Sequence, residues 1–174
     1  MTDYNKVSVT FAKTIPDGRV TGVDINPDIL PRARAVAEMA GIKNIEFQQG
    51  DVYKLPFADE TFDITFCHQM LTHLKAPWDA LREMIRVTKP SGIVAAREGD
   101  FETECVWPEA PGLLKFHRFV SSMMNSKGSA TGGRQLLSWA LKAGAERNQI
   151  TVGHSTWSYT TRSEMRIWGK FFVM

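Results

Sequence analysis

A chain of 174 residues with 43% hydrophobic and 23% charged residues has the size and composition of one globular domain, which excludes a disordered chain. A net charge of +2, with Lys and Arg scattered along the sequence, gives no basis for a nucleic-acid partner. The two cysteines, Cys67 and Cys105, are far apart, so we expect neither a disulfide framework nor a thiolate metal site. Neither a signal-peptide pattern nor a membrane-length apolar run is visible, so we expect a cytoplasmic protein without a membrane partner.

Strand and helix signals alternate from Arg19 onward. Residues 19–25, "RVTGVDI", follow the turn "PDG" and have the β-branched character of a strand. Residues 26–41 have apolar side chains at helical spacing, and Gly41 is a typical helix stop. Residues 43–51 predict the second strand of the series.

The same alternation continues through the middle of the chain. Residues 55–68 contain a polar turn and then a nearly continuous apolar run, 62–67, which is typical of a strand buried on both faces of a parallel sheet. Residues 76–90 predict a helix that ends at a proline, and residues 91–98 predict the fourth strand. This order predicts an α/β fold with a Rossmann-like, doubly wound, mostly parallel sheet.

The pattern changes after residue 99. Residues 101–131 contain one amphipathic helix signal, Leu113 to Met124, and then a Gly/Ser/Thr loop. We expect this segment to be a helical cap that contacts the substrate, inserted into a single domain of residues 1–174. The last predicted elements are a helix at 134–145, a strand-like run at 148–159 and a helical tail at 162–172.

Two aspartates, Asp24 and Asp51, stand at the ends of consecutive predicted strands. In an open α/β sheet, ligands bind beyond the carboxyl ends of the strands. A carboxylate at Asp24 can accept two hydrogen bonds from a ribose diol, and Ile25 beside it offers apolar surface to an adenine face. The Asp51 carboxylate and the backbone amide of Val52 can bond the amino group and a ring nitrogen of the adenine. The pair predicts a cofactor that contains a nucleoside.

Three stretches within residues 18–98 carry a family resemblance: "GRVTGVDINPDILPRARAVAEMAG", "NIEFQQGDVYKLPFADETFDITFCHQMLTHL" and "PWDALREMIRVTKPSGIVAARE". They resemble the class I S-adenosylmethionine-dependent methyltransferases, and within them the ubiquinone/menaquinone-biosynthesis subgroup. The resemblance implies a seven-stranded sheet, S-adenosyl-L-methionine as cofactor and methyl transfer to a small-molecule acceptor. By position it implies that Asp24 holds the ribose, that Asp51 and Val52 hold the adenine, and that His68 lies near the methionine end.

The family's first strand and its glycine-rich turn, roughly D-x-G-x-G-x-G, have no counterpart in this sequence. Such a turn allows the backbone to approach the cofactor closely. By resemblance, residues 7–13 correspond to the helix that follows the turn, and the last strand is missing as well. We therefore expect an incomplete sheet in which the first and last strands are missing or replaced. Alternatively, residues 7–11 alternate in polarity and form an antiparallel hairpin with residues 19–25.

Methyl transfer requires mainly positioning and desolvation, because the acceptor attacks a sulfonium methyl group in line. A general base is needed only for an unactivated hydroxyl, amine or acidic carbon, and His68 and His73 are the candidates. We name His73 as the candidate catalytic residue, although a packing role is the alternative for it. The spacing of the two histidines does not fit a helical metal pair, so no metal is expected.

Two other functions compete with this interpretation. One is a non-catalytic, truncated methyltransferase-fold protein that acts as a binding or dimerisation module through unpaired strand edges or the cap. Unpaired edges would also favour a homodimer. The other is binding of a nicotinamide dinucleotide, which uses the same ribose carboxylate but needs the glycine turn and gives Asp51 no role.

Overall fold

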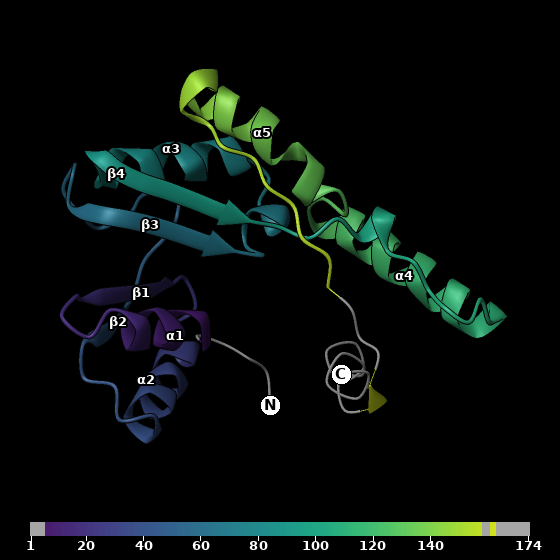
Figure 1. Cartoon of the computed structure of the whole chain (residues 1–174), viewed down its shortest axis with the longest axis horizontal. Helices are drawn as coiled ribbons and strands as arrows, with labels where there is room; N and C mark the ends of the chain where they lie inside the picture. Colours follow the sequence, from purple (N-terminus) through teal and green to yellow (C-terminus); the bar gives the residue numbers. More distant parts are fainter. Residues whose placement is uncertain (1–5, 158–160, 163–174) are drawn as a thin grey trace. The chain divides into compact units, whose positions relative to one another are not determined.

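The computed structural model describes residues 6–157 and 161–162 (Figure 1). The contacts divide the chain into two compact units, residues 1–49 with 151–174 and residues 50–150. The organisation as a single domain, with a cap at residues 101–131, stays a prediction.

A two-stranded parallel sheet is the centre of the first unit. Its elements, in chain order, are α1 (Lys6–Thr14), β1 (Val20–Asp24), η1 (Pro27–Ile29), α2 (Leu30–Met39) and β2 (Ile45–Gln49). The strands pair from Val20 opposite Ile45 to Asp24 opposite Gln49. Both helices contribute to one small core, which contains Val9, Leu30, Ala33, Ala37 and Phe47.

Asn44 ties α1 to this sheet. Its side-chain amide donates to three backbone carbonyls, those of Ala12 at 2.9 Å and of Ile15 and Gly18 at 3.0 Å. The backbone carbonyl of Asn44 accepts the backbone amide of Val20, the first residue of β1, at 2.9 Å. One polar side chain thus satisfies the end of the helix and the loop after it.

The helix α1 decides between the two interpretations of the N-terminal segment. Residues 7–11 are helical, so the antiparallel hairpin with residues 19–25 is wrong. Val9 and Ala12 lie three residues apart on the buried face of the helix. The alternation of apolar residues that suggested a strand is therefore part of the apolar face of a helix.

The second unit also contains a two-stranded parallel sheet. Its elements, in chain order, are β3 (Phe62–His68), η2 (Leu71–His73), α3 (Pro77–Val87), β4 (Thr88–Arg97), η3 (Phe101–Thr103), α4 (Pro111–Lys127), α5 (Gly132–Ala143) and η4 (Arg147–Gln149). The strands pair from Ile64 opposite Ile93 to His68 opposite Arg97. Figure 1 shows α4 extending away from this sheet, whereas α3 and α5 lie next to each other beside it.

The core of the second unit forms where α3 and α5 pack on the sheet. Its buried members are Cys67, Leu71, Ala80, Leu81, Met84, Trp139 and Ala143. The spacing of the α3 residues places them on one face of that helix. Lys142 of α5 lies over the Trp78 ring of α3, with 3.1 Å between its Nζ atom and the ring centroid.

The four strands and the helices predicted up to residue 145 are present, with several shifted boundaries. The largest change in interpretation is at Pro90. The helix α3 ends at Val87, and β4 begins at once with Thr88, so Pro90 lies inside the strand. The pairing of β4 with β3 is irregular at this point, between Phe62 and Ile64. A proline fits such an irregularity because no ladder hydrogen bond requires its missing N–H.

The end of the chain differs from the prediction. Residues 148–157 contain the end of η4 and no strand, so the strand-like run predicted for 148–159 is wrong where the structure describes it. Local strand propensity is not sufficient without a neighbouring strand to pair with. Residues 158–160 and almost all of the predicted helical tail at 162–172 lie outside the described residues.

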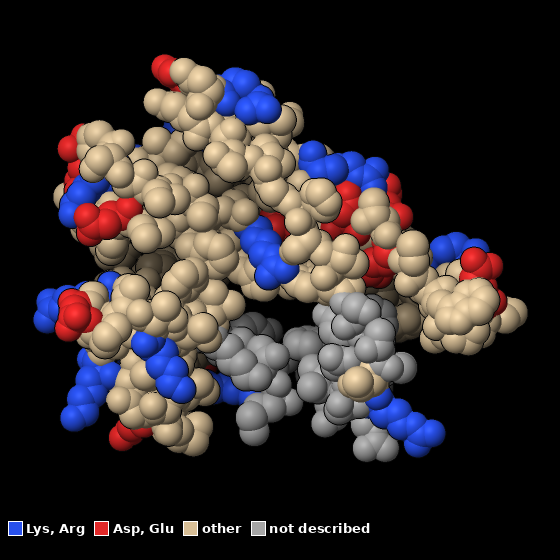
Figure 2. All heavy atoms as spheres, viewed as in Figure 1, with Lys and Arg blue, Asp and Glu red and all other residues tan. Residues whose placement is uncertain are grey.

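The fold class predicted from the sequence is confirmed. Among the described residues, β1 pairs only with β2 and β3 pairs only with β4, and both pairs are parallel. No helix in the described ranges is long and apolar enough to span a bilayer. Figure 2 shows acidic and basic side chains interspersed over the face in view.

Candidate functional site

In the first unit, Asp24 and Ile25 lie together at the carboxyl end of β1. One carboxylate oxygen of Asp24 accepts the backbone amide of Asn26 at 2.9 Å, which fixes the orientation of the side chain. The Ile25 side chain is 66% exposed. Its carbonyl accepts the side-chain amide of Gln49, the last residue of β2, at 3.2 Å. A fixed carboxylate and an exposed apolar side chain therefore stand next to each other at the end of a parallel strand.

In the second unit, Asp51 and Val52 begin a tight turn. The Asp51 carboxylate accepts the backbone amide of Tyr53 at 2.9 Å, and its carbonyl accepts that of Lys54 at 3.0 Å. Asp51 is exposed, whereas Val52 packs against the core of the second unit. The structure thus keeps each predicted pair together. The joint action of the two pairs stays a prediction, because they belong to different units.

His68 is the last residue of β3. Its ring stacks on that of Phe66, with 6.3 Å between the centroids. Burial, and after it the charge of Arg97 on the paired strand, lower the pKa of His68. The imidazole is therefore mainly neutral at neutral pH, the form that can accept a proton.

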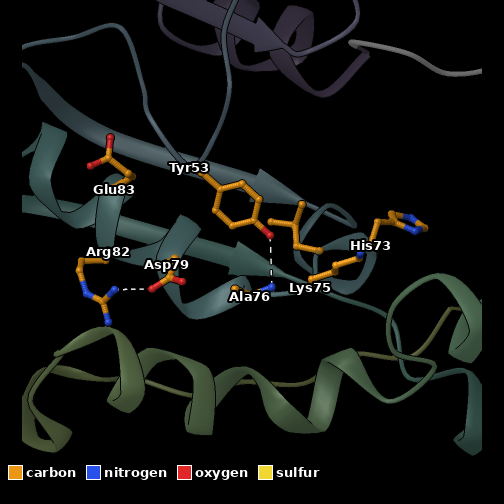
Figure 3. Close-up of a pocket in the computed structure, with 8 residues that line it drawn as sticks. Tyr53, His73, Lys75, Ala76, Asp79, Arg82 and Glu83 are labelled. Atoms are coloured by element: carbon orange, nitrogen blue, oxygen red, sulfur yellow. Dashed lines mark hydrogen bonds and ion pairs between the residues drawn. The ribbon is translucent and has the colours of Figure 1, made fainter.

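His73 ends η2 and lies in the same unit as His68. Partial burial, and after it the charge of Lys127, lower the pKa of His73. The residue borders an open groove of about 750 Å³, in which Figure 3 places it at the end away from Arg82 and Glu83. The two candidate bases are thus separated by one short turn, residues 69–72.

The groove in Figure 3 runs between the turn after Asp51 and the start of α3. Its lining residues are Tyr53, His73, Leu74, Lys75, Ala76, Asp79, Arg82 and Glu83. The Tyr53 hydroxyl accepts the Ala76 amide at 3.2 Å, and Asp79 forms an ion pair with Arg82. These contacts hold the turn of Asp51 and Val52 against α3.

Arg86 holds the loop that follows this turn. Its guanidinium donates to the carbonyls of Leu55 at 3.1 Å and Phe57 at 2.9 Å. It also pairs with Asp59 at 2.7 Å and with Glu83 at 2.8 Å, and the bond from Arg86 lowers the pKa of Glu83. The sequence reasoning missed Arg86, although its spacing of three from Glu83 on a predicted helix is a usable signal.

Glu98, directly after β4, was also missed. Its Oε1 atom accepts the backbone amides of Met70 at 2.9 Å and Leu71 at 2.8 Å. Burial raises its pKa to about 7, against the opposing effect of these backbone bonds. Burial, with the nearby charge of Glu98 as the second cause, also raises the pKa of the Cys67 thiol, whereas Cys105 is exposed.

The loop between α4 and α5, residues 128–131, packs against Thr72, in the turn that follows β3. Ser129 donates its amide to the Thr72 carbonyl at 2.8 Å, and the Thr72 hydroxyl donates to the Ser129 carbonyl. A Cβ on Gly128 would lie 1.8 Å from the Thr72 carbonyl oxygen, so only glycine fits there. Residues 128–131 thus form a close-packed loop, and the two glycines after them begin α5.

The segment of the predicted cap has a charged contact with α5 and a polar contact within itself. Arg134 of α5 forms two bonds with Asp100, one of them at 2.8 Å, and lies 3.5 Å from Glu102. His117 of α4 contacts the Phe101 carbonyl at 2.8 Å. Among residues 6–157 and 161–162, no three His, Cys, Asp or Glu side chains come together in a way that could hold a metal ion.

The chain matches a family model described as a methyltransferase domain over residues 6–144. It therefore belongs to this family of methyltransferase domains, and the class I methyltransferase resemblance predicted from the sequence is confirmed.

Similar proteins agree with this assignment. An uncharacterized methyltransferase of Schizosaccharomyces pombe is 37% identical over 177 residues, which cover 96% of this chain and 62% of the relative. The ubiquinone/menaquinone biosynthesis C-methyltransferase of Bdellovibrio bacteriovorus is 36% identical over 97 residues, which cover 56% of this chain and 41% of that protein. A solved structure of a candidate methyltransferase of Bacillus halodurans has a TM-score of 0.60 and 26% identity, and covers 80% of this chain and 59% of that one. The chain thus spans less than two thirds of the length of these proteins.

Proposed function

We propose that this chain transfers the methyl group of S-adenosyl-L-methionine to a small-molecule acceptor. The observation that carries the proposal is the pair at the end of β1, in which the fixed carboxylate of Asp24 stands beside the 66% exposed side chain of Ile25. A ribose diol and an adenine face need these two kinds of surface next to each other. Membership of the methyltransferase family supports the choice of cofactor.

In this proposal, each candidate residue binds a different part of the cofactor. Asp24 accepts the ribose hydroxyls, Ile25 covers one adenine face, and Asp51 with the Val52 amide binds the adenine edge. His68 lies toward the methionine end. When bound, the cofactor supplies an electrophilic sulfonium methyl group that the acceptor attacks in line.

The base, where the acceptor requires one, is a neutral imidazole. His73 is our first candidate because it borders the groove and its pKa is lowered, so that it is mainly unprotonated at neutral pH. His68 is the second, with a pKa lowered by burial and by Arg97. The cap at residues 101–131 selects the acceptor, and the protein works in the cytoplasm without nucleic acid or membrane as partner.

A second candidate function is a non-catalytic binding or dimerisation module. It is favoured by one observation: in the part of the chain that the structure describes, β1 and β3 each have a single paired neighbour. A strand with one unpaired edge is a template for another chain. In this alternative the protein forms homodimers and binds no cofactor.

The test is calorimetric titration of the protein with S-adenosylhomocysteine, for the unchanged chain, Asp24→Asn and Asp17→Ala. Asparagine keeps an oxygen for the Asn26 amide but loses the charge and the second acceptor that the ribose needs. We expect binding near micromolar, weakened at least about tenfold by Asp24→Asn, which is about 1.4 kcal/mol, and unchanged by Asp17→Ala, at an exposed turn residue.

Absence of binding to a folded, monodisperse sample would overturn the proposal. Sedimentation of the same sample separates the alternatives, because a dimer that binds no cofactor is the result that the binding module predicts. Equal weakening by Asp24→Asn and Asp17→Ala would show that Asp24 has no specific role.

A further inference from the structure

Residues 69–72, which follow β3 and include the first two residues of η2, form a turn that connects the two candidate bases. It leaves the strand through Gln69, which has a φ of 49° and donates its amide to the Arg97 carbonyl at 2.8 Å. Such a φ is uncommon for a residue with a side chain, so the contacts around the turn must hold it in place. Two groups of contacts do so.

The first group comes from one side chain, that of Glu98. Its Oε1 atom accepts two consecutive amides, from Met70 and Leu71, at 2.9 and 2.8 Å. Leu71 is fully buried, so its amide has little access to water as a substitute. Loss of the acceptor would leave buried donors without a partner, which is costly.

The second group comes from the loop between α4 and α5. Thr72 is 1% exposed, and it exchanges two hydrogen bonds with the backbone of Ser129. At the start of α5, Gly133 donates its amide to the carbonyl of Gly99, the residue after Glu98, at 2.9 Å. The amides of the turn are therefore held by Glu98, and its Thr72 carbonyl is held by the segment that joins α4 to α5.

We infer that Glu98 is a positioning residue: by binding the amides of Met70 and Leu71 it fixes the turn that sets His73 relative to His68. The inference rests on the proposed function, because these histidines are the candidate bases of that reaction. Glu98 acts through the backbone amides that it binds. Glu98 thereby sets the position of the imidazole that accepts a proton in the proposed reaction.

The second oxygen of Glu98 distinguishes this side chain from an ordinary helix cap. The Oε2 atom is buried and has no hydrogen-bond partner among the described residues. The titratable neighbour on β3 is the Cys67 thiol, η2 contributes backbone amides, and Arg134 of α5 is bound to Asp100. Burial, opposed by these backbone bonds, raises the pKa of Glu98 to about 7.

Ionisation of Glu98 consequently works against the closed turn. If the turn opens, the carboxyl group meets water and its pKa falls toward 4.5, so a rise in pH favours the open form. The neutral carboxyl holds the turn best, and this effect is fully present below about pH 4.5 and lost as pH rises through about 7. A glutamine has the shape of the neutral form and does not titrate.

The test is amide hydrogen exchange by NMR at Met70 and Leu71, together with the titration of the His73 ring. The samples are the unchanged chain, Glu98→Gln, Glu98→Ala and Glu146→Gln, an exposed carboxyl as matched control. We expect protection in the unchanged chain, corrected for intrinsic exchange, to fall at least about fivefold between about pH 5 and pH 7.5. Glu98→Gln keeps the protection and removes its pH dependence. Glu98→Ala lowers the protection at least about tenfold, whereas Glu146→Gln behaves as the unchanged chain.

The readout also includes the environment of His73. Loss of the turn in Glu98→Ala shifts the apparent pKa of His73, and Glu98→Gln restores it. A folded Glu98→Ala protein with unchanged protection and an unchanged His73 titration overturns the inference. If Glu98→Ala does not fold, Glu98→Gln decides, since the same pH dependence as in the unchanged chain also overturns it.

These measurements need no cofactor, so they stand apart from the calorimetric test. A chain that binds no S-adenosylhomocysteine contradicts the proposed function and leaves the exchange data of Met70 and Leu71 to be judged by themselves. With a chain that binds, the same four samples are titrated with S-adenosylhomocysteine at pH 6 and 8. We expect the affinity of Glu98→Ala to be lower than that of Glu98→Gln at both values.

Discussion

Gly22 of β1 lies directly opposite Phe47 of β2, and a Cβ on Gly22 would lie 2.5 Å from the Cδ1 atom of the Phe47 ring. Phe47 is 6% exposed and is part of the core of the first unit. The ring therefore lies against the backbone of β1, and glycine is required there for space rather than for an unusual backbone angle.

The substitution Gly22→Ala should therefore destabilise the first unit. A methyl group forces the Phe47 ring out of its place in a packed core, and such overpacking costs about 1–3 kcal/mol. Urea unfolding followed by circular dichroism measures the loss. Gly112→Ala is the matched control, because a Cβ on Gly112 meets nothing within 4 Å. Equal midpoints for the two variants would contradict the prediction.

Gly128→Ala should be more damaging than Gly22→Ala. Its Cβ would meet a backbone oxygen, that of Thr72 at 1.8 Å, and a backbone yields less readily than a ring. The loop must retreat and lose its two bonds with Thr72, so we expect a loss of about 3 kcal/mol. Thermal unfolding monitored by calorimetry checks this value. A melting temperature like that of Gly112→Ala would show that the loop is not close-packed.

Arg86→Ala should lower the unfolding midpoint and expose the loop of residues 55–59. The guanidinium of Arg86 bonds two carbonyls of this loop, whereas Arg82 on the same helix has an exposed partner, Asp79. Arg82→Ala is thus the control, and its midpoint should change little. Arg86→Lys keeps the charge but not the several donors, so its unfolding midpoint should lie between those of Arg86→Ala and Arg82→Ala. Limited proteolysis, with cleavage sites read by mass spectrometry, should show new cuts in residues 55–59 for Arg86→Ala alone.

The overall stability should fall as pH rises from about 4.5 to about 7 through the contribution of Glu98. Its pKa is raised in the folded protein to about 7, so the folded state binds more protons than the unfolded state in this window. The contribution is fully present below about pH 4.5, is lost as pH rises through about 7, and amounts to at most about 3 kcal/mol. Chemical unfolding at a series of pH values measures it. The difference between the unchanged chain and Glu98→Gln should vary over this range, and a constant difference would contradict the prediction.

The order of strands and helices was predictable because burial imposes a period on neighbouring residues. The apolar run 62–67 and the helical stripe of α3 are both visible in the sequence, and both elements are present. The expectation that the strand is buried on both faces is wrong, because Ile64 is 59% exposed. Boundaries were less predictable. Pro90 suggested the end of a helix, but it lies in an irregular part of β4, which depends on the partner strand. Residues 148–157 show the converse case, in which strand-like letters have no strand to pair with.

The candidate site was predictable only where neighbours in sequence act together. Asp24 with Ile25 and Asp51 with Val52 are such neighbours, and each pair lies at the end of a strand or in the turn that follows it. Glu98 reaches an amide 27 positions away, and Thr72 meets Ser129 across 57 positions. Contacts at this sequence separation arise from the tertiary fold, and local periodicity does not predict them.

The burial of Cys67 makes the two thiols of the chain chemically unequal. A reagent such as iodoacetamide reacts with thiolates, so the raised pKa and the burial of Cys67 protect it in the folded protein. Cys105, exposed between η3 and α4, takes the label under native conditions. The second label enters only when the core under α3 and α5 opens. The mass of the labelled protein therefore records the opening of that core molecule by molecule, without any substitution in the chain.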